Sequence, residues 1–182
     1  VIADCACKGN QVYDEWIVRD QGAMVRQIGY SPKEFAQIMI DKEGGVDNAK
    51  KLFDKSEIKP SDYLPEDVRI NSAGEKYSKI LNSVFEEGYD FMDYNRASSI
   101  YWPGNRLGHG REDVAKFWNS LKNIFTEIKF SIEHVGYLDE PNKNPKASIR
   151  WFLEGKHSID SDDYGKKTNS KLFIMGINHV EL

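Results

Sequence analysis

Six stretches of the chain have the alternation, or the β-branched and aromatic composition, that is typical of strands. Apolar and polar residues alternate most regularly along residues 127–137 and 147–158. The other four stretches are residues 1–7, 11–20, 98–102 and 171–182. Residues 8–10, Lys-Gly-Asn, predict a hairpin turn between the first two strands, because Gly and Asn adopt a positive φ at low cost.

Helical spacing and end signals predict helices between these strands. One helix follows the capping box Ser31-Pro32-Lys33-Glu34 and ends at Gly44-Gly45, and another follows a second box at Ser72–Glu75. Further helices are predicted over residues 21–29, over residues 47–55 and from Arg111 onward. The two helices of the second half each have one apolar face, made by Tyr77, Ile80, Leu81, Val84 and Phe85 in the first and by Val114, Phe117, Trp118, Leu121, Ile124 and Phe125 in the second.

The order of these elements predicts three parts and an α+β fold. Residues 1–29 form a hairpin with a short helix, and residues 30–70 form a helical linker in which Pro60 and Pro65 stand among charges. Residues 71–182 form the main body, which runs helix, strand, helix and then three long strands. This order indicates a curved antiparallel sheet that wraps around helices and leaves a cavity in the cone.

The strands at the two ends would each leave an open sheet edge, which proteins normally cover. We therefore expect residues 1–20 to pair with residues 171–182 in one sheet, within one chain or between two copies. The closing strand of the sheet would then come from the N-terminus. The last strand also has apolar residues on both faces, so its outer face needs cover, and we expect a homodimer.

Composition narrows the classes of protein. With 40% apolar and 12% aromatic residues the chain has enough material for a core. A net charge of −4 argues against general nucleic-acid binding, and no apolar run is long enough for a membrane span. No signal peptide is evident, so a cytoplasmic location is expected. Cys5 and Cys7 are expected to be buried free thiols in a reducing compartment.

Short motifs in a fixed order carry a resemblance to a known family. They are Gly108-His-Gly-Arg-Glu112, Phe117-Trp118, Ile132-Glu-His-Val-Gly136, Arg150-Trp-Phe-Leu-Glu-Gly-Lys-His157, Tyr164-Gly165 and Ile174-Met-Gly-Ile-Asn-His179. In this order they resemble the SnoaL-like polyketide cyclase (ester cyclase) branch of the nuclear transport factor 2-like superfamily. Glu15-Trp16, Asp20 and Gln27-Ile-Gly29 are similar to that family's closing strand and terminal helix. In the family this strand comes last, so the resemblance implies a permuted chain, an exchanged strand or a piece of a tandem protein.

The resemblance also implies a cystatin-like cone with one apolar cavity and cofactor-independent chemistry. In the family, acid/base chemistry removes a proton from a carbon next to carbonyl groups before an intramolecular aldol closure, and a His–carboxylate pair suits that step. The implied partner is a small apolar carbonyl compound, with no cofactor and no metal. Candidate catalytic residues are His157, His179 and Asp20, and candidate ligand-binding residues are Trp16, Tyr101, Trp102, His134, Trp151 and Asn178.

Strand parity places these side chains only in part. His134 follows Phe130 and Ile132 on their face, and His157 follows Trp151 on its face. Parity leaves open which of the neighbours at positions 178 and 179 points inward. Each histidine also has a plain structural interpretation as a hydrogen-bonded residue of a sheet, and the aromatic residues have one as core.

Three functions therefore stay open. The first is a cofactor-independent cyclase, isomerase or hydratase, which an inward His157 beside an acid or amide would favour. The second is a non-catalytic binding domain that uses an apolar cavity. The third is a structural or dimerisation module, which a filled cone would favour.

Overall fold

The computed structural model describes residues 1–48 and 70–182. The helices and strands of these residues are, in chain order, β1 (Ile2–Lys8), β2 (Gln11–Val18), α1 (Gln21–Gln27), α2 (Pro32–Lys42), α3 (Ser72–Ser83), β3 (Ser99–Trp102), β4 (Arg106–His109), α4 (Gly110–Ile124), β5 (Phe125–Leu138), β6 (Lys146–His157) and β7 (Lys171–Glu181). The expected linker prolines and most of the expected helix at residues 47–55 lie outside the described residues. The predicted α+β class with antiparallel sheets is confirmed.

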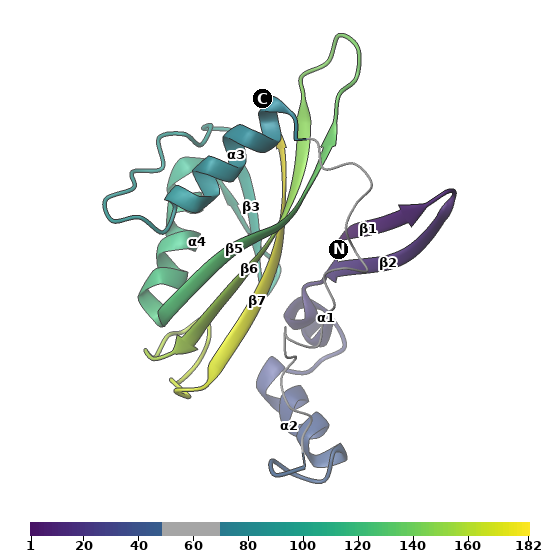
Figure 1. Ribbon diagram of the computed structural model, residues 1–182. Coiled ribbons are helices and arrows are strands. Elements are labelled where there is room, and N and C mark those ends of the chain that lie inside the picture. Colours follow the sequence, from purple (N-terminus) through teal and green to yellow (C-terminus); the bar gives the residue numbers. More distant parts are fainter. Residues whose placement is uncertain (49–69) are drawn as a thin grey trace.

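Three antiparallel sheets make up the β structure of the described residues. The largest has the order β5-β6-β7, and the hairpins β1-β2 and β3-β4 are two-stranded sheets. Helices α3 and α4 cover one face of the large sheet, which we call the inner face (Figure 1). The β1-β2 hairpin lies on the other side of β7, and α1 and α2 extend away from the main body (Figure 1). We call the face that points away from α3 and α4 the outer face.

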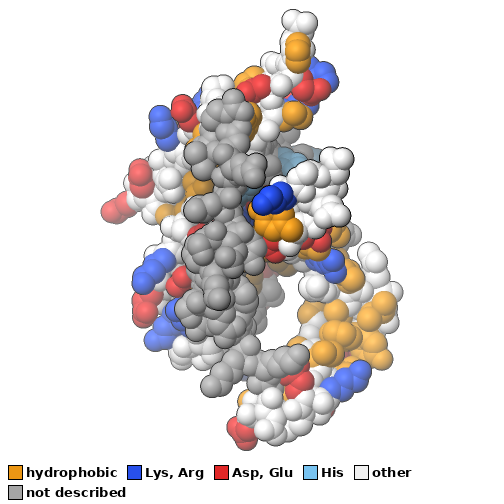
Figure 2. Space-filling view, turned by 45° about the vertical axis from the view of Figure 1, so that its right-hand side comes forward, with side chains coloured by type: hydrophobic (Ala, Val, Ile, Leu, Met, Phe, Trp, Pro, Cys, Tyr) orange, Lys and Arg blue, Asp and Glu red, His pale blue; other side chains and the backbone are white. Residues whose placement is uncertain are grey.

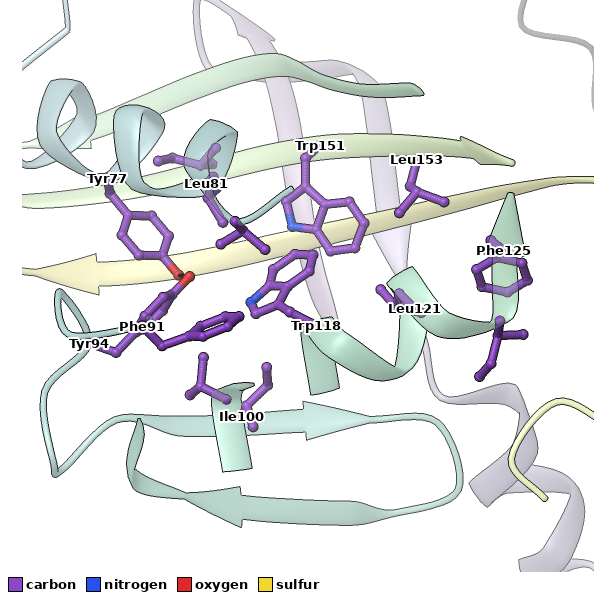
Figure 3. Close-up of a cluster of buried hydrophobic side chains, with 14 residues drawn as sticks. Tyr77, Leu81, Phe91, Tyr94, Ile100, Trp118, Leu121, Phe125, Trp151 and Leu153 are labelled. Carbon is purple, nitrogen blue, oxygen red and sulfur yellow. Dashed lines mark hydrogen bonds between the residues drawn. The ribbon is translucent and has the colours of Figure 1, made fainter. Parts of the chain in front are cut away.

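The hydrophobic core lies between the inner face and the two helices. Alternate residues of β6 point into it, as the alternating pattern predicts, so Ile149, Trp151 and Leu153 are buried. From the helices, Leu81 and Trp118 meet these side chains, and Trp118 lies 5.2 Å from Trp151 between ring centroids (Figure 3). Aromatic rings from the sheet and from the helices therefore make up much of this core.

A glycine on β7 allows Trp151 to pack against the sheet. Gly176 pairs with Trp151 across the ladder, and a Cβ at position 176 would lie 2.0 Å from the indole ring. The missing side chain therefore lets the indole lie flat over the neighbouring strand, where any larger residue would displace it.

The start of α3 differs from the prediction. Asn71, and not Ser72, is the N-cap residue, and its side chain accepts a hydrogen bond from the backbone N–H of Gly74. The same side chain donates to the backbone carbonyl of Lys146 and to Asp139, so it also fastens the helix to the end of β5 and β6. These hydrogen bonds to distant residues favour Asn71 as the N-cap over Ser72, where the local capping box predicted it. The box at Ser31 is confirmed, with both hydrogen bonds present.

The expected pairing of the N-terminal hairpin with the last strand is wrong within one chain. Strands β1 and β2 bond only each other, and β7 is an edge strand of the large sheet. The hairpin instead packs side chains of β1 and β2 against the outer face. Cys5 and Cys7 point away from that contact and are exposed, so the expectation of buried thiols is also wrong. The exchange of the hairpin between two copies stays a prediction.

Candidate functional site

A chain of polar side chains crosses the inner face. Asn178 points inward, since it stands opposite the buried Ile149, and its Oδ1 accepts a 2.6 Å hydrogen bond from Nε1 of Trp151. Its Nδ2 donates to the hydroxyl of Tyr77 at 3.2 Å, and that hydroxyl donates to Tyr94 at 3.3 Å. In Figure 3 the two tyrosine hydroxyls meet beside the indoles of Trp118 and Trp151. These bonds join Trp151, Asn178 and the two tyrosines, while Nε1 of Trp118 is buried without a hydrogen-bond partner in the described residues.

Burial controls the protonation of the two tyrosines. It raises the pKa of Tyr77 to about 12, against smaller opposing effects of the hydrogen bonds to Tyr94 and Asn178. Burial and the neighbouring Tyr77 also raise the pKa of Tyr94. Both hydroxyls are therefore neutral hydrogen-bonding groups at physiological pH.

His157 is buried on the inner face, as parity predicts, but the described residues show no hydrogen bond from its ring to an acid or an amide. The residue is 3% exposed, and its ring lies 5.8 Å from the ring of Phe125. Its Nε2 is buried and has no hydrogen-bond partner within the described part of the chain. A general base needs an orienting partner to fix its tautomer, so the expected acid/base pair is not formed in this structure.

His134 lies on the outer face, contrary to the parity prediction. A β-bulge between Ile132 and His134 shifts the register, so that Ile132 pairs with Trp151 while His134 pairs with Arg150. Neighbours on β6 point to opposite faces, and the extra residue Glu133 therefore reverses the side chains that follow it. The alternation of apolar residues in β5 gives no sign of this reversal.

The outer face carries a charged cluster that joins the hairpin to the large sheet. Nδ1 of His134 lies 3.0 and 2.9 Å from Oδ1 and Oδ2 of Asp4, which comes from β1. Nε of Arg150 lies 2.9 Å from Oδ2 of the same carboxylate, as an ion pair whose N–H direction does not meet hydrogen-bond geometry. The side chains are 16% exposed for Asp4 and 11% for Arg150. One carboxylate of the hairpin thus contacts two basic side chains of the main body.

The charges of this cluster stabilise one another against burial. Burial opposes the ionisation of Asp4, but the hydrogen bond and charge of His134, with the charge of Arg150, hold the pKa of Asp4 below its ordinary value. Burial also lowers the pKa of Arg150, and the carboxylates of Asp4, Glu133 and Asp14 counter part of that effect. Oδ2 of Asp14 is buried without a hydrogen-bond partner in the described part of the chain.

Aromatic contacts complete the junction. The guanidinium carbon of Arg150 lies 4.3 Å from the centroid of the Trp16 ring, in a cation–π arrangement. Trp16 also meets Phe152 edge to face, with 6.0 Å between centroids. Phe152 points to the outer face and is nevertheless only 4% exposed. We name the group of Asp4, Trp16, His134, Arg150 and Phe152 the junction cluster.

Asp20 ties the hairpin to β3 and β4 and lies outside the junction cluster. Its carboxylate accepts hydrogen bonds from the backbone N–H groups of Ala23, Gly104 and Asn105, at 2.6 to 3.0 Å. Burial opposes its ionisation, but these backbone bonds lower the pKa of Asp20 overall. All of these bonds cap α1 or hold the turn between β3 and β4, so Asp20 has a structural role here.

The remaining candidates do not gather at one site. Tyr101 is 74% exposed, so it cannot line an interior cavity, while Trp102 stacks on Phe117 with 5.9 Å between centroids. His179 points outward and lines a shallow depression of about 270 Å³ together with Lys146. That depression lies at the end of β6 opposite to His157. Among the candidates, Trp151 and Asn178 lie together on the inner face, and Trp16 and His134 lie together on the outer face.

Metal binding and membrane insertion find no support in the described residues. Within residues 1–48 and 70–182, no group of three or more His, Cys, Asp or Glu side chains is arranged to hold a metal ion. None of the helices in this part of the chain is long and apolar enough to cross a membrane. Comparisons with protein-family models, with curated proteins and with solved structures found no significant match.

Sequence reasoning missed the centre of the junction cluster. None of Asp4, Arg150 and Phe152 is among the candidate site residues that the sequence predicts. A usable signal was present in β6, where Arg150 and Phe152 share the face opposite to Trp151. An arginine beside a large aromatic residue on a supposedly solvated face indicates a surface that something covers.

Proposed function

We propose that this chain is a non-catalytic assembly domain whose outer sheet face is a docking surface for a β-hairpin. The observation that carries the proposal is the contact that Phe152 and Arg150, on the face away from the core, make with Trp16 and Asp4 of the hairpin. A surface built to meet water would not place a phenylalanine and a nearly buried arginine side by side.

The contents of the inner face support the same proposal. Trp118, Trp151 and Leu153 are buried there, and Nε2 of His157 has no hydrogen-bond partner within the described residues. A closely packed aromatic core is what we expect of a domain that acts through its surface rather than through a pocket. We retain the cystatin-like cone and the likeness to SnoaL-like proteins as part of the proposal. On that basis, residues 1–29 belong to one SnoaL-like unit and the main body to another, and the hairpin of the first docks on the outer sheet face of the second.

A double-mutant cycle tests the docking in solution. Trp16→Leu, Phe152→Leu and the double variant are compared in their free energy of unfolding by urea. We expect a coupling energy of about 0.5–1.5 kcal/mol, since an edge-to-face aromatic pair contributes this much beyond its buried area. The matched control pairs Tyr13→Leu with Phe152→Leu, because Tyr13 is on the exposed side of the hairpin. Coupling that is zero in both cycles would contradict the proposal.

A second function has one specific observation in its favour. The buried Nε2 of His157 lacks a hydrogen-bond partner in the described residues, and buried polar atoms are nearly always satisfied. A small apolar carbonyl compound bound beside His157 would present the C–H group next to its carbonyl to that nitrogen, and the unprotonated Nε2 would accept this proton as the general base that the family likeness implies, without a cofactor.

Thermal shifts separate this second function from the first. Wild type and His157→Ala are melted with and without small ketones and β-keto esters. If a ligand binds at His157, the wild type gains melting temperature with the ligand and the variant does not. If no compound shifts the wild type while His157→Ala alone lowers the melting temperature, the histidine is structural and the second function fails.

A further inference from the structure

The helices α1 and α2 carry an apolar surface that the main body leaves uncovered. Helix α2 has no fully buried residue, although Phe35, Ile38 and Ile40 are half-buried. Met39 is 41% exposed, Met24 of α1 is 50% exposed, and Ile28 at the C-cap of α1 is 63% exposed. Figure 2 shows apolar side chains gathered on the lower lobe of the molecule, which these two helices form in Figure 1. An 11-residue helix without a fully buried residue is only marginally stable, so we expect a partner for this surface.

The order of residues along α2 identifies the kind of partner. Glu34, Ile38 and Lys42 stand at i, i+4 and i+8, so they form one row along the helix, with Phe35 and Met39 beside it. The row has an acidic end, an apolar middle and a basic end. Turned end for end, it complements itself, because Glu34 of one helix then meets Lys42 of another.

We infer that α2 binds α2 of a second copy of this chain, antiparallel and about a two-fold axis at Ile38. An isologous contact requires a surface that is complementary to itself, and this row meets that condition. The net charge of the helix agrees with a neutral partner, since its two basic residues (Lys33 and Lys42) balance two acidic ones (Glu34 and Asp41). Helix α2 therefore has no net charge that would attract a nucleic acid or a strongly charged peptide.

The size of the contact sets its strength. An 11-residue helix is about 16 Å long, so two such helices with the exposed residues of α1 bury less than the 1,200–2,000 Å² of a standard interface. The association is therefore reversible, with a dissociation constant in the micromolar range or weaker. It is independent of the junction cluster, which uses the opposite end of the N-terminal segment.

A charge exchange tests this pairing. Glu34→Lys and Lys42→Glu are made separately in the full chain, and their masses are measured by sedimentation equilibrium from 1 to 500 µM, alone and mixed. Each variant alone places like charges at both ends of the contact, and we expect its dissociation constant to rise at least tenfold. The mixture restores two opposite-charge pairs, so it should associate within about threefold of the wild type. Circular dichroism checks that Glu34→Lys, which loses its bond to the Ser31 N–H, keeps its helix.

A cross-link tests the position of the axis. In a background of Cys5→Ser and Cys7→Ser, which removes both exposed thiols, Ile38→Cys should form a disulfide-linked dimer under mild oxidation. Lys33→Cys, on the opposite side of the helix, should not. The inference is overturned if the wild type is monomeric at 500 µM, if the mixed variants associate no better than either alone, or if both cysteine variants cross-link equally. None of these outcomes depends on whether the hairpin docks on the sheet.

Discussion

Trp151 is the residue on which the packing of the inner face depends. Its indole covers Gly176 on the neighbouring strand, donates a hydrogen bond to Asn178 and contacts Trp118 from α4. Three elements therefore meet at one side chain. A substitution at any of its neighbours therefore disturbs the packing of the whole core, because protein interiors are close-packed.

We predict that Gly176→Ala destabilises the protein by about 2 kcal/mol or more, since the added methyl group overlaps the indole and must displace it. Gly136→Ala is the matched control in the same sheet. There the nearest atoms would be 3.9 Å from the new Cβ, so we expect a change of less than about 1 kcal/mol. Urea unfolding of both variants measures the difference, and equal effects would contradict the packing described for Trp151.

Asp4 makes the junction cluster sensitive to acid. Its pKa is lowered in the folded chain, so its contribution to stability is complete above its ordinary value of 3.8 and is lost as the pH falls below that value. We predict that Asp4→Asn lowers the free energy of unfolding by about 1–3 kcal/mol at pH 6. The deficit relative to the wild type should shrink on going to pH 3.

Unfolding of the two proteins between pH 3 and pH 7 measures this dependence. Asp162→Asn is the control, since Asp162 is an exposed aspartate of the loop before β7. Its stability should follow that of the wild type at every pH. A deficit for Asp4→Asn that is the same at pH 3 and pH 6 would show that the carboxylate charge is not what holds the hairpin.

At the scale of elements, one chain of hydrogen bonds runs from Trp151 on β6 through Asn178 on β7 to Tyr77 on α3. It ends at Tyr94, in the segment before β3. A buried network of this kind fixes the register of the elements it joins, because each member leaves another unsatisfied when it is removed. It also makes the core sensitive to alkaline conditions.

We predict that stability falls between pH 10 and pH 12. The pKa of Tyr77 rises from 10.0 to about 12 in the folded chain, so this contribution is complete below pH 10 and is lost as the pH rises through the folded value. Tyr77→Phe should be less stable at pH 7, since the amide of Asn178 loses its acceptor, but its stability should depend less on pH above 10. Parallel slopes for the two proteins above pH 10 would refute the assignment.

Local sequence patterns predicted the helices and strands well, but they predicted poorly which strands pair and which sheet face a side chain occupies. The strands of the large sheet and the helix that carries Trp118 follow from alternation and helical spacing, which are local properties. Strand β4 was missed, because Pro103 and Gly104 indicated only the end of a strand and not a hairpin turn. The face of His134 could not be predicted, since one bulge residue reverses it without any change in composition.

At the scale of the whole molecule, the two parts of the N-terminal segment have different surroundings. The hairpin meets the outer face of the large sheet through the junction cluster, whereas α2 has no fully buried residue and extends away from the main body (Figure 1). The sequence resemblance predicted that residues 1–29 form a unit apart from the main body, and that division stays a prediction. It predicted a strand added to a sheet edge, whereas the chain uses side chains that pack on a sheet face.

Hydrogen–deuterium exchange of residues 2–18 tests the central claim most directly. An isolated two-stranded hairpin is marginal in water, so slow exchange of its amides reports docking on the sheet. We predict protection in the wild type, and a loss of at least tenfold in Arg150→Met, while the amides of β6 stay protected in both proteins. If the amides of residues 2–18 exchange in the wild type as fast as in an unstructured peptide, while β6 is protected, the hairpin is not held on the sheet and the proposed assembly role is contradicted.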